Sequence, residues 1–184
     1  MISTLAFVVS IAVPLVYGQS VDSVDYTRCE CYDYNIHCGK ETWDSAKALC
    51  EAEGGWLATI DNEQLWTDLR VEINNNNMNN KECHNFGFWI GLHDANRDDI
   101  DSDADKHDAD DLEWLEPMCT YYTKWAPGEP NDNTKKSHQG QNAVQLWFRG
   151  NKDGLYDDDY EFREKGYICQ VPLENCSCTE EDEG

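Results

Sequence analysis

The chain has few basic residues. Its 14 lysines and arginines stand against 37 aspartates and glutamates, which gives a formal net charge of -23 at pH 7. A surface that acidic repels phosphate groups, so the composition excludes nucleic acids and anionic membrane surfaces as partners. Divalent cations suit such a charge, and the plainer alternative is an acidic surface that only keeps a secreted protein soluble.

Long apolar runs are missing as well, apart from one near the start of the chain. The run between Thr4 and Val16 is too short to span a bilayer and has the length of a signal-peptide core. Residues 1–18 are therefore expected to be a signal peptide, cleaved after Gly18, and the mature chain to be soluble and secreted. The alternative is a buried N-terminal strand or helix.

The sequence has no paired nucleophile and base and no cofactor-binding loop, so we expect a protein that is not an enzyme. Its nine cysteines all follow the expected signal peptide, and none has the spacing of a zinc site. In an oxidising compartment most should form disulfides. An odd number leaves at least one thiol free, capped or bonded to another chain.

The apolar pattern predicts one α+β unit with irregular ends. Thr42 should cap a helix that Gly54 and Gly55 end. Asp61 and Gln64 resemble a capping box for a second helix, which the asparagine-rich run 74–80 should end as a solvated loop. Apolar runs predict strands at 56–60, 88–92, 143–148 and 166–171.

Two short segments gather side-chain oxygens. They are Glu129-Pro130-Asn131-Asp132 and Gly154-Leu155-Tyr156-Asp157-Asp158, and we expect each to form a turn because proline and glycine disfavour helix there. Calcium takes about six to eight oxygen ligands, so the two turns together could supply most of them. A cation held from one side by protein can coordinate a hydroxyl-bearing ligand on the other.

These features as a set resemble a C-type lectin-like domain over residues 31–171. The resemblance rests on the two helices, the segment 89–92 (Trp-Ile-Gly-Leu), the segment 125–131 (Trp-Ala-Pro-Gly-Glu-Pro-Asn) and a closing strand with a cysteine. It implies an α+β fold with two helices, antiparallel strands and a long calcium-binding loop. A cysteine-bearing segment, 19–30, would precede the domain and an acidic tail, 172–184, would follow it.

The resemblance also implies a function and its residues. Family members bind sugars by coordinating two sugar hydroxyls to calcium, so we expect a secreted carbohydrate-binding protein for recognition or innate immunity, with glycans or glycoproteins as partners. The implied ligands of the principal calcium are Glu129, Asn131, Gln141, Asp157 and Asp158, of which the first four would also contact the sugar. An auxiliary calcium would use Asp94, Asp98 and Asp132, with Asn142 in place of a further aspartate.

Two of the principal ligands depart from the family pattern. Gln141 replaces a glutamate and Asp157 replaces an asparagine, so the total negative charge is kept. The Glu-Pro-Asn motif implies a mannose-type ligand, and the exchanged donor and acceptor predict relaxed selectivity that admits galactose. The alternative is a lectin-like module that binds protein or mineral through its acidic surface; Gln141 and Tyr156, which replaces a tryptophan, favour it.

The resemblance implies one outer disulfide, between Cys50 and Cys169. The family's inner disulfide is missing, because Ala143 and Glu161 occupy its two positions. Cys83 and Cys119 are available to bridge elsewhere. We expect the odd thiol to belong to the terminal cysteines and, if exposed, to link a homodimer; these are Cys29, Cys31, Cys38, Cys176 and Cys178.

The insert 98–111 is the part least like the family. Aspartates at 101, 103 and 105 resemble the start of an EF-hand loop, but Lys106 replaces the required glycine and Leu112 the bidentate glutamate. We therefore expect a solvated, self-repelling acidic loop. The alternative is a weak cation store or a contact with mineral or a basic partner.

Overall fold

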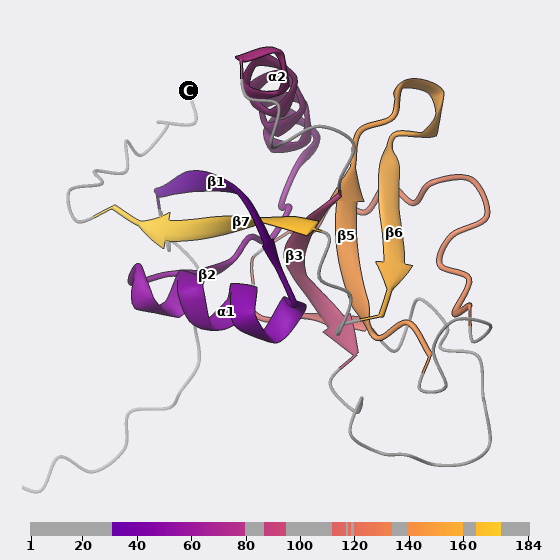
Figure 1. The fold of residues 1–184 in the computed structure, drawn as a ribbon, viewed down its shortest axis with the longest axis horizontal. Helices are drawn as coiled ribbons and strands as arrows, with labels where there is room; N and C mark the ends of the chain where they lie inside the picture. The colour runs from indigo at the N-terminus through magenta and orange to yellow at the C-terminus, as the bar shows by residue number, and fades with distance from the viewer. Residues whose placement is uncertain are drawn as a thin grey trace, which may run out of the picture.

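A single mixed sheet organises the described part of the chain. The computed structural model describes residues 31–79, 87–94, 112–116, 118, 120–133, 140–159 and 165–173. The elements in order are β1 (Tyr32–Glu41), α1 (Trp43–Ala52), β2 (Trp56–Leu57), α2 (Glu63–Asn79), β3 (Phe88–Asp94), β4 (Leu112–Trp114), β5 (Ala143–Trp147), η3 (Gly150–Lys152), β6 (Gly154–Asp158) and β7 (Lys165–Pro172). The predicted α+β class is confirmed (Figure 1).

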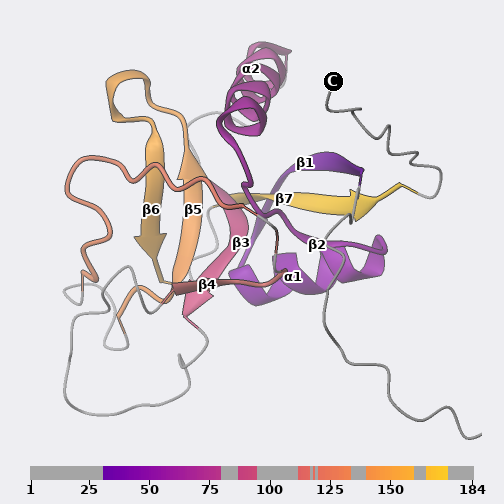
Figure 2. The ribbon, with the colours of Figure 1, turned by 180° about the vertical axis from the view of Figure 1, so that it is seen from behind.

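The sheet joins the two ends of the domain. Its strand order is β1-β7-β3-β5-β6, with β2 paired to β7 and β4 to β3. β1 is antiparallel to β7, from Tyr32 opposite Pro172 to His37 opposite Tyr167, whereas β3 and β7 are parallel. The view from behind shows β4 crossing beside the end of β3 (Figure 2). No helix among the described residues is both long and apolar enough to cross a membrane.

All six predicted elements, two helices and four strands, are present, and several boundaries differ. Thr42 caps α1, accepting from the backbone N–H of Ser45, as predicted. The predicted strand at 56–60 forms a ladder only over β2, while β3, β5 and β7 match the other three predictions closely. The strands β1, β4 and β6 were not predicted. In β1 the signal was present, because Tyr32, Tyr34 and Ile36 alternate with polar residues, whereas β4 has only three residues and β6 ends in two aspartates.

The start and end of α2 were predicted wrongly. Its cap is Asn62, whose Oδ1 accepts from the N–H of Leu65 at 2.8 Å, one residue later than predicted. The helix then continues through Asn79 instead of ending at the asparagine run. Trp66, Leu69 and Ile73 are buried on one face and anchor the helix before the asparagine run. Extending a formed helix costs far less than nucleating one, so the modest helix propensity of asparagine does not end it there.

The segment 154–158 is a strand and not the predicted turn. β6 pairs antiparallel with β5 from Gly154 opposite Trp147 to Asp158 opposite Ala143. Glycine is needed at its start for close approach, because a Cβ on Gly154 would lie 2.4 Å from the backbone nitrogen of Ala126. Backbone contact at this point brings the chain before β5 against β6.

The predicted outer disulfide is confirmed. Cys50 and Cys169 are bonded, with their Cα atoms 5.2 Å apart, and both are fully buried among Trp43, Leu57 and Trp89. The indole N–H of Trp43 donates to the carbonyl of Ile90 at 2.9 Å, so this core satisfies its polar atoms. Cys31 and Cys38 are disulfide-bonded too, which removes both from the candidates for the odd thiol.

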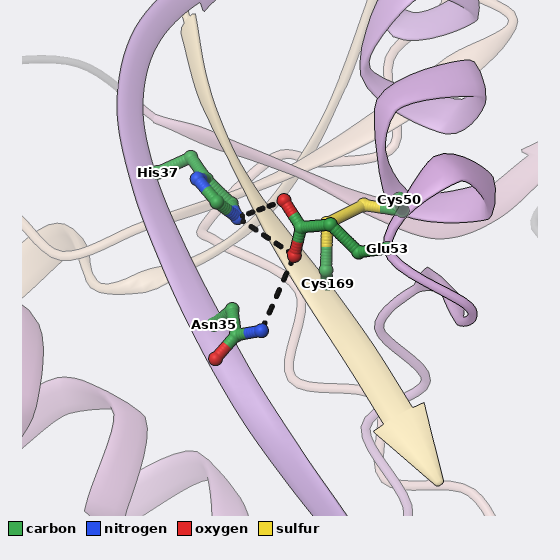
Figure 3. The surroundings of a disulfide bond; sticks show 5 residues. All are labelled: Asn35, His37, Cys50, Glu53 and Cys169. Atoms are coloured by element: carbon green, nitrogen blue, oxygen red, sulfur yellow. Dashed lines mark hydrogen bonds and ion pairs between the residues drawn. A yellow bond between two sulfur atoms is a disulfide. The ribbon is translucent and has the colours of Figure 1, made fainter.

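A small polar group covers the disulfide on the side of β1. Glu53, which follows α1, lies 3.0 Å from Nε2 of His37 and accepts from the side-chain amide of Asn35 at 3.2 Å (Figure 3). His37, Glu53 and Cys169 are close enough together to hold a metal ion. The sulfur of Cys169 is consumed by the disulfide, however, so it offers no thiolate and the group is better described as a link between β1 and α1.

Candidate functional site

The loop before β5 is held against β6 by its backbone. The N–H of Ala126 donates to the carbonyl of Leu155 at 3.0 Å, and the N–H of Leu155 donates to the carbonyl of Lys124 at 2.8 Å. The loop then reverses through a cis peptide bond between Glu129 and Pro130. This path carries the Glu-Pro-Asn motif to the end of β6 that bears Asp157.

Asp157 is the centre of the candidate site. Its carboxylate accepts from the backbone N–H of Asn131 at 3.0 Å and from that of Asp132 at 2.6 Å. The residue is only 4% exposed. A buried carboxylate with two backbone donors ties the motif to β6 and leaves further lone pairs on its oxygens for a cation.

Glu129 lies against this carboxylate. Burial raises its pKa to about 8, with further contributions from a hydrogen bond with Asp157 and from the charges of Asp157 and Asp158, while a hydrogen bond from the Asn131 side chain opposes the shift. Neighbouring carboxylates whose charges raise the pKa of Glu129 form a site that favours a bound cation. The donor set, carboxylate and amide oxygens, fits calcium.

Gln141 belongs to the same cluster but ties the loop together. Its side-chain N–H donates to the carbonyl of Asp157 at 2.9 Å, and its Oε1 accepts from the N–H of Asn133 at 2.6 Å. Its backbone N–H donates to Asp132 at 2.8 Å. One lone pair of Oε1 remains for a cation, so Gln141 can act as a ligand while it also holds the loop.

Asp158 has partners that the sequence analysis missed. Its Oδ2 lies 2.7 Å from Nζ of Lys165 and accepts from the side-chain amide of Gln145 at 2.7 Å. Both residues are buried and polar. The signal was present in the sequence, since each is a long polar side chain within or beside an otherwise apolar strand. We name Glu129, Asn131, Gln141, Asp157 and Asp158 together the Glu129 cluster.

The auxiliary residues are only partly brought together. Asp94 and Asn142 are almost fully buried, and the N–H of Asp94 donates to the carbonyl of Asn142 at 3.0 Å. The side chains of Asp132 and Asn142 both face Gly140, whose backbone has φ +80° and where a Cβ would lie 2.5 Å from Oδ1 of Asp132. Asp98 and the rest of the insert 98–111 lie outside the described residues, as do Cys83, Cys119 and Glu161.

The sequence of the chain is similar to those of known proteins. It is 30% identical to C-type lectin lectoxin-Phi1 of Philodryas olfersii over 57% of this chain and 61% of that protein. It is 24% identical to human E-selectin over 80% of this chain and 21% of that protein. The chain therefore spans only part of the length of these curated relatives.

Solved structures show the same fold. Human lithostathine superposes with a TM-score of 0.57 at 20% identity, covering 77% of this chain and 92% of that one. The C-type lectin domain of murine dendritic cell inhibitory receptor 2, solved in complex with an N-glycan, gives 0.52 at 23% identity over 77% and 91% of the two chains.

The family model that matches the chain is the Lectin C-type domain, over residues 39–171. The match includes both helices, the closing strand with Cys169 and the whole Glu129 cluster. Together with the confirmed fold and outer disulfide, it shows that the chain belongs to the C-type lectin domain family.

Proposed function

We propose that this protein is a secreted lectin that binds carbohydrate through a calcium ion held by the Glu129 cluster. The observation that supports this proposal most strongly is the convergence of Glu129 with Asp157 and Asp158, whose charges add to burial in raising the pKa of Glu129. The bound calcium would supply open coordination positions for sugar hydroxyls. The chain's own part is binding and orientation, not catalysis.

Glu129 and Asn131 would orient the first sugar hydroxyl. Their side chains are hydrogen-bonded to each other, which places a carboxylate acceptor beside an amide donor. A hydroxyl that coordinates calcium can donate to the first group and accept from the second. Gln141 and Asp157 would serve the second hydroxyl, but the backbone of the loop already uses part of their capacity.

The proposal is tested on a column of immobilised mannose with elution by a chelator. The natural protein should be retained with calcium and released without it, and Glu129→Ala should pass through. Asp33→Ala is the matched control, because it removes an exposed carboxylate on β1, at the far edge of the sheet. If the natural protein is not retained on mannose, galactose or glucosamine columns in the presence of calcium, sugar binding is contradicted.

Calcium affinity should fall as the pH falls below about 8, the raised pKa of Glu129. Calcium needs the ionised carboxylate, so it must displace a proton below that pH. In chelator, stability changes with pH in the opposite direction. Between pH 4.5 and about 8 the folded state keeps a proton on Glu129 that the unfolded state has lost. The free energy of unfolding therefore falls as the pH rises through that range.

Both effects are measured against Glu129→Gln, which cannot titrate. Calcium titrations across that range should give an affinity that depends on pH in the natural protein. In the variant the affinity should be lower and should change less with pH. Melting in chelator should show the falling stability only in the natural protein. Equal pH profiles for the two proteins would show that Glu129 does not titrate with the raised pKa.

We expect selectivity for mannose with some acceptance of galactose. The double change Gln141→Glu with Asp157→Asn restores the family arrangement of donor and acceptor, so it should strengthen the preference for mannose several-fold. Inhibition of column binding by free mannose and free galactose measures that ratio. If the natural protein binds mannose strictly and the double substitution changes nothing, the exchange of donor and acceptor at Gln141 and Asp157 does not set the selectivity.

The second candidate function is binding of protein or mineral by the acidic surface, without sugar recognition. Two observations favour it: Asp158 already has a cationic partner in Lys165, and Gln141 already has two backbone partners. A module of this kind would bind its partner equally with calcium and with chelator, and Glu129→Ala would leave that binding unchanged.

We also propose a disulfide-linked homodimer. Cys31 and Cys38 are bonded, so of the terminal cysteines Cys29, Cys176 and Cys178 remain as the source of an odd thiol. Two weak sugar sites on one dimer would gain avidity. Electrophoresis without reductant should show a dimer that reductant converts to monomer; monomer alone, with no titratable thiol, would point to a small-molecule cap.

A further inference from the structure

Lys165, the first residue of β7, is a buried lysine next to the proposed calcium site. The residue is 4% exposed, and its Nζ lies 2.7 Å from Oδ2 of Asp158. The same Nζ lies 4.9 Å from the centroid of the Trp89 ring. A lysine is rarely buried unless its charge is paired, so Lys165 needs the carboxylate of Asp158 to remain charged in its buried position.

The surroundings hold this ammonium group in place. Trp89 is fully buried, and its indole N–H donates to the carbonyl of Glu41 at 2.9 Å, so the ring cannot swing away. On the other side Gln145 donates to the same oxygen of Asp158 at 2.7 Å. The ammonium group therefore lies between an aromatic face and the Asp158 carboxylate, with little room to withdraw.

We propose that Lys165 is an internal counter-cation of the calcium site, which holds Asp158 in the absence of calcium and lowers the affinity for calcium. This inference rests on the proposed function, because it assigns Asp158 to the calcium. The contact that assigns this role is the one between Lys165 and Asp158. Lys165 is a positioning residue that acts through one ligand.

The physical basis is competition between two cations for one carboxylate. Calcium must share Asp158 with Lys165 or draw the carboxylate away from it, and either step weakens an ion pair whose lysine is buried while its carboxylate is 24% exposed. The ammonium charge also repels calcium over a distance of a few ångströms through a medium of reduced dielectric constant. Both effects lower calcium affinity, and both disappear when the charge is removed.

The test compares calcium affinities by calorimetry for the natural protein, Lys165→Met and Lys165→Arg. Methionine keeps an apolar chain over Trp89 without the charge, and we expect it to bind calcium about tenfold more tightly. Arginine keeps the charge and should stay close to the natural protein. Lys152→Met is the matched control, since it removes an exposed lysine from η3 and should leave the affinity unchanged.

A second readout does not depend on calcium. In chelator, Lys165→Met leaves Asp158 without its cation, so the variant should melt at a lower temperature than the natural protein. Calcium should raise the melting temperature of the variant by more than it raises that of the natural protein. Lys165→Gln gives the same comparison if the methionine variant does not fold. Equal melting of natural and variant proteins in chelator would show that the ion pair does not hold Asp158.

The outcomes separate this inference from the proposed function. Tighter calcium binding by Lys165→Met supports it, even if the natural protein binds no calcium, in which case only the proposed function fails. Calcium binding by the natural protein with equal or weaker binding by Lys165→Met overturns the inference alone. If none of the proteins binds calcium, Lys165 is a structural ion pair and both proposals fail.

Discussion

Asp157→Ala is expected to abolish the response to calcium and to destabilise the protein even in chelator. The substitution removes a proposed ligand and leaves the N–H groups of Asn131 and Asp132 without their acceptor. Leaving such donors unpaired costs about 1–3 kcal/mol each when water cannot replace the acceptor, and less where it can. The Glu-Pro-Asn loop should therefore detach from β6.

Asp157→Asn separates the two effects. An asparagine can still accept at its carbonyl oxygen, so the loop should stay attached and most of the stability in chelator should remain. It removes one negative charge beside Glu129, so the pKa of Glu129 should move back toward its ordinary value. Calcium binding should weaken but persist, because asparagine is the residue that the family pattern has here.

Thermal melting with calcium and with chelator measures both variants, with Asp33→Ala as the control on β1. The expected order of melting temperature in chelator is natural protein, then Asp157→Asn, then Asp157→Ala. The expected order of the increase caused by calcium is the same. An undiminished calcium response in Asp157→Ala would exclude Asp157 as a ligand and move the site elsewhere in the acidic surface.

Removing the Cys50–Cys169 disulfide should cost more than any other pair of substitutions that we consider. The bond joins residues 119 apart in sequence, so it restricts a large loop in the unfolded chain. The chain-entropy estimate for a loop of that size is about 4–5 kcal/mol, a large part of the stability of a small domain. Both sulfurs are buried, so the space they leave adds a packing cost.

The double variant Cys50→Ala with Cys169→Ala avoids an unpaired thiol. Denaturant unfolding should show its free energy lowered by several kcal/mol with a changed m value, since the unfolded chain becomes less restricted. Leu49→Ala is a matched control on the exposed face of α1, and its effect should be small. A loss of less than about 1 kcal/mol in the double variant would mean that the unfolded chain stays compact without the bond.

Local signals predicted the elements that depend on local chemistry. Thr42 caps α1 because a side-chain oxygen before a helix accepts from its first turn wherever that helix packs. The apolar runs of β3, β5 and β7 are buried strands because few other structures remove such runs from water. The asparagine run does not stop the helix, because Trp66, Leu69 and Ile73 anchor the helix before the run and extending a formed helix costs little.

The residue types of the candidate site could also be read from the sequence, but their partners could not. The motif residues and Asp157 meet because the loop lies along β6, and that contact depends on Gly154 letting the backbone of Ala126 approach. The sequence pattern predicted Gln141 only as a ligand, whereas in the fold its side chain also hydrogen-bonds the backbone of both Asn133 and Asp157. Such contacts join residues that are not neighbours in the chain.

By itself, the sequence determined the family, the oxygen-rich motif, the outer disulfide pair and the acidic charge, because these depend on residue types and spacing. Only the tertiary structure decided which charged side chains of the candidate site contact one another. It set Glu129 against Asp157, and it set Asp158 against Lys165 across β6 and β7. The reason is that Coulomb and hydrogen-bond energies depend on distance and burial in the folded state, and both are set by contacts between a loop and a strand and between strands that are not neighbours in the sheet.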